Sequence, residues 1–159
     1  MSTNAEQQSR PGLKSGRTSE FTLFFNVTPG HGQQIRAIFQ QPGLAEMRKE
    51  MISRIGTLHD ARWVLFDDDT RLLFATNFDG DWDAYIDDFA AQIPDLFDAV
   101  LQHTEGYPGI HDPNIKDFVL AHQATAASYF RAIPEATLKD LQKGQRVQEA
   151  FQRLLDEAS

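Results

Sequence analysis

The side chains best suited to chemistry lie on a hairpin that we expect within residues 57–78. If its acidic turn spans residues 67–70, antiparallel pairing places Asp60 opposite Asn77, with Arg62 diagonal to Asn77 on the same face. A carboxylate, a guanidinium and an amide on one face could orient a polar ligand in an otherwise apolar cavity. The alternative is that Asp60 and Arg62 form an ion pair within the sheet, worth about 0 to 1 kcal/mol.

A second set of polar side chains lies where the chain passes from residues 99–104 into a loop. His103 and Glu105 are two positions apart, so on an extended backbone they share a face and could work as a base and its orienting group. Tyr107 precedes a Pro-Gly turn and could contact a ligand or serve only as a structural plug. The candidate catalytic residues are therefore His103, Arg62 and Asn77, and the candidate ligand-binding residues are Asp60, Asn26, Tyr107 and Glu105.

Two of the five histidines lie where an imidazole could ligate haem iron. His122 falls on the apolar face of an expected helix, and His59 falls on the apolar face of the hairpin. The alternative for each is a histidine packed in the core or at an interface. The sequence therefore leaves two possibilities open: no cofactor, or a haem held by His122 or His59.

Other metal and covalent chemistry has little support. The chain has no cysteine, which excludes thiolate nucleophiles, zinc–thiolate sites and iron–sulfur clusters. The three consecutive aspartates Asp67, Asp68 and Asp69 lack the glycine and the distal glutamate of a calcium loop. No Gly-x-Ser-x-Gly elbow, phosphate-binding glycine loop or dinucleotide fingerprint is present. We therefore expect no metal apart from a haem.

Composition limits the partners and the location. The 159 residues carry a formal net charge of -8, and Lys and Arg are scattered singly, so we expect no binding to nucleic acid. No apolar run approaches the ~20 residues that span a bilayer, so we expect no membrane insertion. The absence of cysteine fits a reducing compartment, and we expect a cytoplasmic protein. Residues 1–20 are polar and predict a flexible tail, followed by a single domain over residues 21–159.

Periodicity predicts an α+β protein. Apolar residues alternate in the segments that we expect to be strands and recur every three or four residues in those that we expect to be helices. A helix broken at Pro42 follows the first strand, and Asp81 is a good N-cap for a helix that Pro94 closes. This order predicts a ferredoxin-like four-stranded antiparallel sheet with two packing helices plus two C-terminal helices. The expected strands are residues 21–27, 57–66, 71–78 and 99–104, and the expected C-terminal helices are residues 114–131 and 137–158.

The segment from residue 21 to residue 104, with the turn Thr28-Pro29-Gly30-His31 after its first strand, resembles the ferredoxin-like domains of the dimeric α/β-barrel superfamily. Its hairpin, LHDARWVLFDDDTRLLFATNFDGDWDAYIDDF, is also similar to that of uncharacterised bacterial members. The resemblance implies a homodimer whose two sheets pair face to face, with a cavity in the barrel or between sheet and helices. The superfamily includes cofactor-free monooxygenases, haem-degrading enzymes and haem peroxidases, so the fold does not select a reaction.

Three functions follow from these residues. We expect a small-molecule-binding protein or an oxidoreductase-like enzyme of the dimeric α/β-barrel type, acting on an apolar or aromatic compound. The first alternative is a haem-binding protein, either peroxidase-like or haem-degrading. The second is a non-catalytic assembly partner that uses the acidic surface and the terminal helices. Whether the protein is an enzyme stays open at this point, because no general base is unambiguous.

Overall fold

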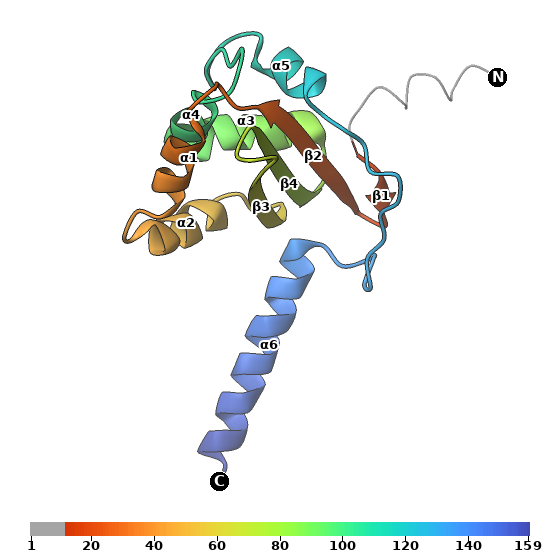
Figure 1. The fold of residues 1–159 in the computed structure, drawn as a ribbon. Coiled ribbons are helices and arrows are strands. Elements are labelled where there is room, and N and C mark those ends of the chain that lie inside the picture. Colours follow the sequence, from red (N-terminus) through yellow and green to blue (C-terminus); the bar gives the residue numbers. More distant parts are fainter. Residues whose placement is uncertain (1–11) are drawn as a thin grey trace, which may run out of the picture.

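The computed structural model describes residues 12–159 as a four-stranded antiparallel sheet with six helices (Figure 1). The strands lie in the order β1-β2-β4-β3. The predicted fold class, a ferredoxin-like α+β sheet with packing helices and C-terminal helices, is confirmed. The strands are β1 (Lys14–Ser15), β2 (Thr18–Asn26), β3 (Leu58–Phe66) and β4 (Arg71–Asp79). The helices are α1 (Gly32–Phe39), α2 (Leu44–Ser53), α3 (Trp82–Gln92), α4 (Pro94–Leu101), α5 (Ile115–Ala121) and α6 (Leu138–Glu157).

The hairpin of β3 and β4 has the predicted register. Asp60 pairs with Asn77 and Arg62 pairs with Ala75. A β-bulge before Asp60 leaves His59 without a partner in the ladder. Because side chains alternate across a strand, this register separates the charged and amide groups from the aromatic ones, as the sequence predicted.

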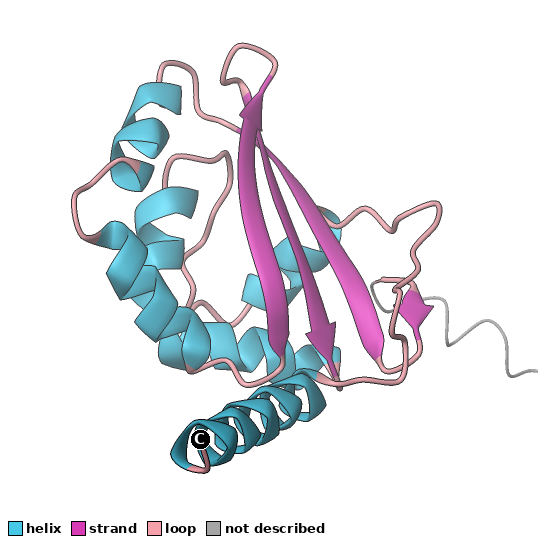
Figure 2. Ribbon diagram, turned by 90° about the horizontal axis from the view of Figure 1, so that it is seen from below, coloured by secondary structure: helices cyan, strands magenta, loops and turns pink. Residues whose placement is uncertain are grey.

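The aromatic core lies between one face of the sheet and the helices, most of which gather on that side (Figure 2). The ring of Tyr85 on α3 stacks on Phe78 of β4, with ring centroids 4.1 Å apart. Phe74 of β4 meets Phe97 of α4 edge to face at 5.4 Å. Each fully buried side chain of this size contributes roughly 1.5 to 3 kcal/mol of apolar burial, so this layer is the main stabilising feature of the domain.

The predicted strand over residues 99–104 is wrong, because the chain forms α4 up to Leu101. Pro94 stands in the first turn of α4, where its missing N–H removes no helical hydrogen bond. Phe97, Val100 and Leu101 follow at helical spacing and are all buried. Their spacing of three to four residues buries one face of a helix. The alternation within residues 99–104, on which the strand was predicted, is the weaker pattern.

The fourth strand of the sheet is β1, which pairs with the start of β2. Gly16, with φ of 64°, lies in the turn between the two strands, and glycine adopts this left-handed backbone without strain. Strand residues therefore occur at positions 14–15 and 18–20, within the predicted tail of residues 1–20, so the folded part begins earlier than predicted. The rest of that predicted tail, residues 1–11, lies outside the described residues.

The predicted helix over residues 114–131 is much shorter, because α5 ends at Ala121. The chain then runs along the edge of β2. The Phe24 N–H donates to the carbonyl of His122 at 2.9 Å, and the Ala124 N–H donates to the carbonyl of Thr22 at 2.9 Å. Unpaired backbone groups at the edge of a sheet need partners, and this segment supplies them in place of a helix.

The last helix, α6, begins where the sequence predicts. Thr137 and Asp140 form the capping box, with each side chain bonded to the backbone N–H of the other residue. Beyond this first turn α6 extends away from the sheet and the other helices (Figure 1). None of its residues is buried. Over residues 12–159, no helix is both long enough and apolar enough to cross a bilayer.

Candidate functional site

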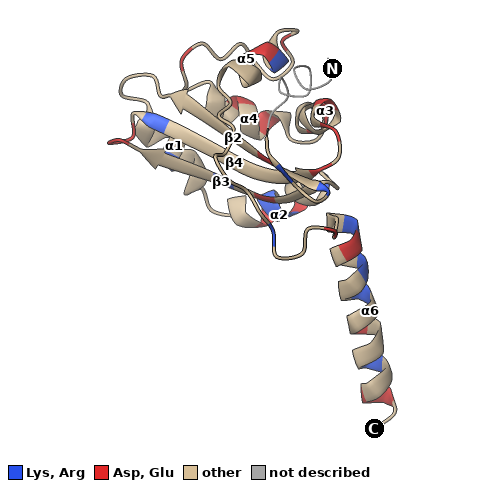
Figure 3. Cartoon of the chain, turned by 90° about the vertical axis from the view of Figure 1, so that its right-hand side faces the viewer, with Lys and Arg blue, Asp and Glu red and all other residues tan. Residues whose placement is uncertain are grey.

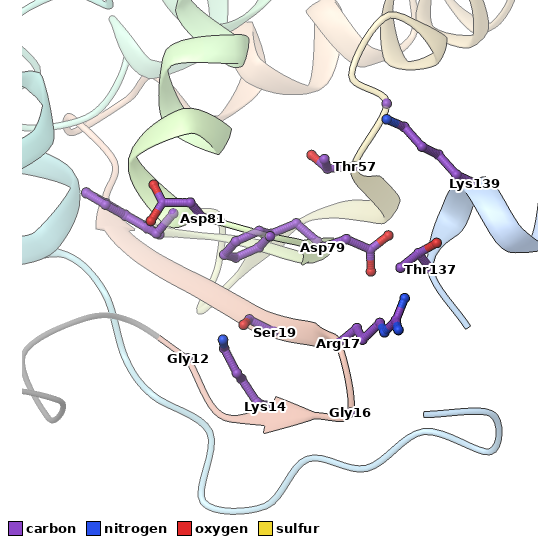
Figure 4. Close-up of a pocket in the computed structure, with 14 residues that line it drawn as sticks. Gly12, Lys14, Gly16, Arg17, Ser19, Thr57, Asp79, Asp81, Thr137 and Lys139 are labelled. Atoms are coloured by element: carbon purple, nitrogen blue, oxygen red, sulfur yellow. The ribbon is translucent and has the colours of Figure 1, made fainter. Parts of the chain in front are cut away.

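A large hollow opens at the end of the sheet where β1, β2 and β4 meet the first turns of α3 and α6 (Figure 4). Its volume is about 1150 Å³, and we name it the basal cleft. Phe78 and Trp82 lie in its wall, with 1% and 6% of their surface exposed. Ligand sites usually measure roughly 300 to 1,000 Å³, so the basal cleft has room for a small organic molecule.

Three cationic side chains surround the basal cleft: Lys14 of β1, Arg17 before β2, and Lys139 in the first turn of α6 (Figure 4). None of them forms an ion pair with another residue in the described part of the chain. Elsewhere the cations Arg36 and Lys116 do have carboxylate partners. In a protein of formal net charge -8, three such cations around one hollow create a local preference for an anion.

The two carboxylates of the basal cleft are already engaged. Asp79 accepts hydrogen bonds from the Thr18 hydroxyl, from His59 Nε2 and from the Leu138 N–H, each 2.7 Å long. Burial acts to raise the pKa of Asp79, but these hydrogen bonds outweigh it and hold the pKa below its ordinary value. Asp81 is the N-cap of α3 and accepts a hydrogen bond from its first turn. Both carboxylates are thus bonded within the fold, and among residues 12–159 neither forms an ion pair with Lys14, Arg17 or Lys139.

Two polar atoms behind the wall of the basal cleft have no hydrogen-bond partner among the described residues. They are the indole Nε1 of Trp82 and the hydroxyl oxygen of Thr57, and both are shielded from solvent. An unbonded buried polar group costs about 1 to 3 kcal/mol, and such groups are rare in native proteins.

A smaller hollow of about 380 Å³ lies beside the edge strand β3, next to α1 and α2. We name it the edge cleft. Phe39 and Trp63 contribute aromatic surface to its wall, and Arg62 lies on its lining. The Nε and Nη2 atoms of Arg48 are buried and have no hydrogen-bond partner within residues 12–159, and the guanidinium carbon lies 4.8 Å from the centroid of the Phe39 ring. The edge cleft therefore also combines aromatic surface with an unbonded cation.

Of the three predicted site residues on the hairpin, only Asp60 and Asn77 contact each other. The Asn77 Nδ2 donates to both carboxylate oxygens of Asp60, at 2.9 and 3.0 Å. Arg62 belongs to the edge cleft and forms no ion pair with Asp60 within residues 12–159. Part of the sheet face that bears Asp60 is covered, because the Ala126 N–H donates to Glu20 Oε1 at 2.9 Å. Asp60 and Asn77 thus bind each other beside this covering segment.

His103, the predicted base, is paired with a second histidine. The Nδ1 atoms of His103 and His31 lie 3.0 Å apart, so one ring donates to the other. Burial, followed by the charge of His31, lowers the pKa of His103. Glu105, the predicted orienting group of this base, instead lines a third hollow of about 500 Å³. His103 is therefore bonded to His31 and not to Glu105.

The remaining predicted binding residues lie at the far end of the sheet from the basal cleft. Asn26 lines the same third hollow as Glu105. The Tyr107 hydroxyl donates to Asp98 at 2.7 Å, and burial, followed by that hydrogen bond, raises the pKa of the tyrosine. The predicted site residues are thus divided between the hairpin and this far end, and no single hollow among those of the described chain gathers them.

Both histidines predicted as alternative haem ligands are engaged in protein contacts. His122 Nδ1 lies 2.7 Å from the carbonyl oxygen of Phe118, and its ring stacks on Phe25 with centroids 5.2 Å apart. His59 lies at the bulge before Asp60, and its Nε2 is 2.7 Å from Oδ1 of Asp79. Within residues 12–159 no group of three or more His, Asp or Glu side chains is placed to hold a metal ion.

Comparisons with known proteins identify no relative. A scan against protein-family models, a search of curated proteins and a search of solved structures each found no match. The fold class rests on the sheet and helices described above, and the functional assignment rests on the geometry of the clefts.

Sequence analysis missed the basal cleft. Lys14 and Arg17 lie in the segment predicted to be a flexible tail, and Lys139 lies at the other end of the chain. No motif links the three cations, because the fold alone brings them together. The one available signal was the pair of glycines Gly12 and Gly16 around Lys14, which marks backbone of unusual conformation in that segment.

Proposed function

We propose that the protein binds a small organic anion in the basal cleft. The anionic group lies among Lys14, Arg17 and Lys139, and the apolar body of the ligand packs on Phe78 and Trp82. One observation carries the proposal: three cations that form no ion pair with any residue of 12–159 line a hollow of about 1150 Å³, whose own carboxylates are hydrogen-bonded within the fold. A carboxylate or phosphate ester with an aromatic or aliphatic body matches both kinds of wall.

The strength and salt dependence of such binding follow from the exposure of the cations. An ion pair at the mouth of a cleft contributes about 0.2 to 1 kcal/mol, whereas a hydrogen bond to a charged group contributes about 1.5 to 3 kcal/mol. Exposed charges are also screened by salt over about 8 to 10 Å at physiological ionic strength. We expect modest affinity that falls as the ionic strength rises.

The edge cleft is a second candidate for the same class of ligand. The observation that favours it is the Arg48 guanidinium, two of whose nitrogens have no hydrogen-bond partner among the described residues, next to the aromatic surface of Phe39 and Trp63. It also contains Arg62, which the sequence analysis selected. Its smaller volume, about 380 Å³, suits a single aromatic ring with one anionic group.

The finer predictions from the family resemblance stay predictions: membership of the dimeric α/β-barrel superfamily, oxidoreductase-like activity, a haem site and a face-to-face dimer. The contacts of residues 126–131 bear on the dimer. Ala126 is bonded to Glu20, and Arg131 is bonded to Thr18, so this segment occupies part of the sheet face that a second sheet would need. The proposal of an anion site in the basal cleft depends on none of these predictions.

Isothermal titration calorimetry with simple probes tests the proposal. Phenyl phosphate and benzoate supply the anion and the ring, and benzyl alcohol supplies the ring alone. We expect saturable binding of an aromatic anion that Arg17→Gln or Lys139→Gln weakens about threefold to tenfold. Lys49→Gln is the matched control, because Lys49 is an exposed lysine of α2 outside all three hollows. Equal binding of benzyl alcohol, or an equal loss in the control, contradicts the proposal.

A further inference from the structure

The helix α6 has a continuous apolar stripe with nothing packed on it among the described residues. The helix is 20 residues long, about 30 Å at 1.5 Å per residue, and none of its residues is buried. Val147, Phe151 and Leu154 each keep about 60% of their surface exposed (60%, 59% and 60%). We define the apolar stripe as Leu141, Gly144, Val147, Phe151, Leu154 and Leu155.

An isolated helix with such a stripe lacks its main source of stability. Most helical stability in proteins comes from packing of the apolar face and not from helix propensity. The capping box of Thr137 and Asp140 secures only the first turn of α6. The stripe therefore indicates a partner surface, and its spacing of three and four residues, at positions 144, 147, 151 and 154, is that of a helix-to-helix seam.

The charges of α6 are divided between its two halves (Figure 3). A partner helix that ran antiparallel would face each half with charges of opposite sign, whereas a parallel copy would face like with like. An antiparallel arrangement also places the two folded bodies at opposite ends of the helix pair. The first ten residues carry three cations (Lys139, Lys143, Arg146) and one carboxylate (Asp140), and the last ten carry three carboxylates (Glu149, Asp156, Glu157) and one cation (Arg153).

We propose that α6 pairs antiparallel with α6 of a second copy of this chain. In one register the two apolar stripes face each other along their length. Val147 then faces Phe151 of the partner subunit, and Gly144 faces Leu154 of the partner subunit. The absence of a side chain at Gly144 makes room for the leucine. The same register sets Lys143 beside Glu157 of the partner subunit, so the flanks of the seam carry opposite charges.

Sedimentation equilibrium of the full chain tests this pairing. We expect twice the mass of one chain at micromolar concentrations, and a monomer for the double variant Phe151→Glu, Leu154→Glu with the unfolding midpoint of the sheet domain retained. The matched control Gln142→Glu, Gln145→Glu adds the same charge outside the stripe and should remain dimeric. A monomeric wild type overturns the proposal. So does a dimer that survives the stripe substitutions, which would indicate another surface such as the open sheet face.

A charge exchange tests the orientation without disturbing the stripe. Lys143→Glu sets two carboxylates together at each end of the seam, and we expect the dimer Kd to rise about tenfold. Adding Glu157→Lys to the same chain restores opposite charges in the antiparallel register and should restore the Kd. Failure of the double exchange to restore dimerisation overturns the antiparallel arrangement. Neither measurement depends on ligand binding in the basal cleft.

Discussion

Oδ2 of Asp79 accepts a hydrogen bond of 2.7 Å from the backbone N–H of Leu138, which joins the last residue of β4 to the first residue of α6. Its other oxygen, Oδ1, accepts from Thr18 and His59, so one carboxylate connects β2, β3, β4 and α6. This contact ties the first residue of α6 to the sheet, next to Lys139 at the basal cleft.

Replacing Asp79 with Asn should destabilise the domain. The amide keeps one acceptor oxygen but turns an NH₂ group toward donors, so buried groups lose their partners. We expect the free energy of unfolding to fall by about 2 to 4 kcal/mol in urea titrations. Asp81→Asn is the matched control, because Asn caps a helix as well as Asp does and should change stability by no more than about 0.5 kcal/mol. Equal effects of the two substitutions would refute the role given to Asp79.

Replacing Thr57 with Val should leave stability unchanged or raise it. The Thr57 hydroxyl is buried and has no partner in the part of the chain that the structure describes, so its removal relieves a cost of about 1 to 3 kcal/mol. Thr76→Val is the paired experiment, because the Thr76 hydroxyl accepts a 2.6 Å bond from the buried Tyr85 hydroxyl. There we expect a loss of about 1 to 3 kcal/mol in the free energy of unfolding. A loss at Thr57 as large as that at Thr76 would mean that the Thr57 hydroxyl has a partner.

The histidine pair should make the fold sensitive to mild acid. Burial and His31 lower the pKa of His103 below its ordinary 6.5, so the unfolded chain takes up a proton more readily. Stability is therefore full above about pH 6.5 and declines as the pH falls from there through the folded pKa. His103→Asn should flatten this part of the curve of unfolding free energy against pH. The exposed control His111→Asn should leave this curve unchanged. A curve that is steeper without His103 would contradict the predicted loss of stability on protonation of His103.

Replacing Phe25 with Ala should open a cavity in the core. Phe25 is 2% exposed and stacks on Phe118 with centroids 5.8 Å apart. We expect a loss of about 3 to 5 kcal/mol in thermal or chemical unfolding. Phe130, 83% exposed, provides the control, because its replacement by Ala should change stability by less than about 0.5 kcal/mol. A small effect at Phe25 would place the core elsewhere.

The hairpin could be predicted from sequence because its information is local. The alternation of residues 57–66 and 71–78 and the acidic turn between them determine the pairing of Asp60 with Asn77, and the structure has that pairing. Three left-handed residues, Asp67, Asp68 and Asp69, form the turn, a conformation that aspartate tolerates better than most residues. The N-cap Asp81 was predictable as well, because the signal for a helix N-cap is also local in the sequence.

The edge of the sheet and the basal cleft could not be predicted in this way. β1 has only two residues, too few to show a period, and the chain after Ala121 follows β2 because of backbone hydrogen bonds that any sequence can make. The cleft arises where residues 12–19 and residues 137–139 meet the same end of the sheet, a relationship over more than 100 residues. Side-chain periodicity carries no signal of such contacts.

The fluorescence of Trp82 tests the proposed anion site most directly. The chain has two tryptophans, and Trp63→Phe leaves only the one that lines the basal cleft, whereas Trp82→Phe leaves only the one that lines the edge cleft. We predict that phenyl phosphate or benzoate changes the Trp82 emission of the Trp63→Phe variant in a saturable, salt-sensitive manner and that benzyl alcohol does not. Emission that stays constant with both anions, or a saturable change seen only from Trp63, would contradict binding in the basal cleft.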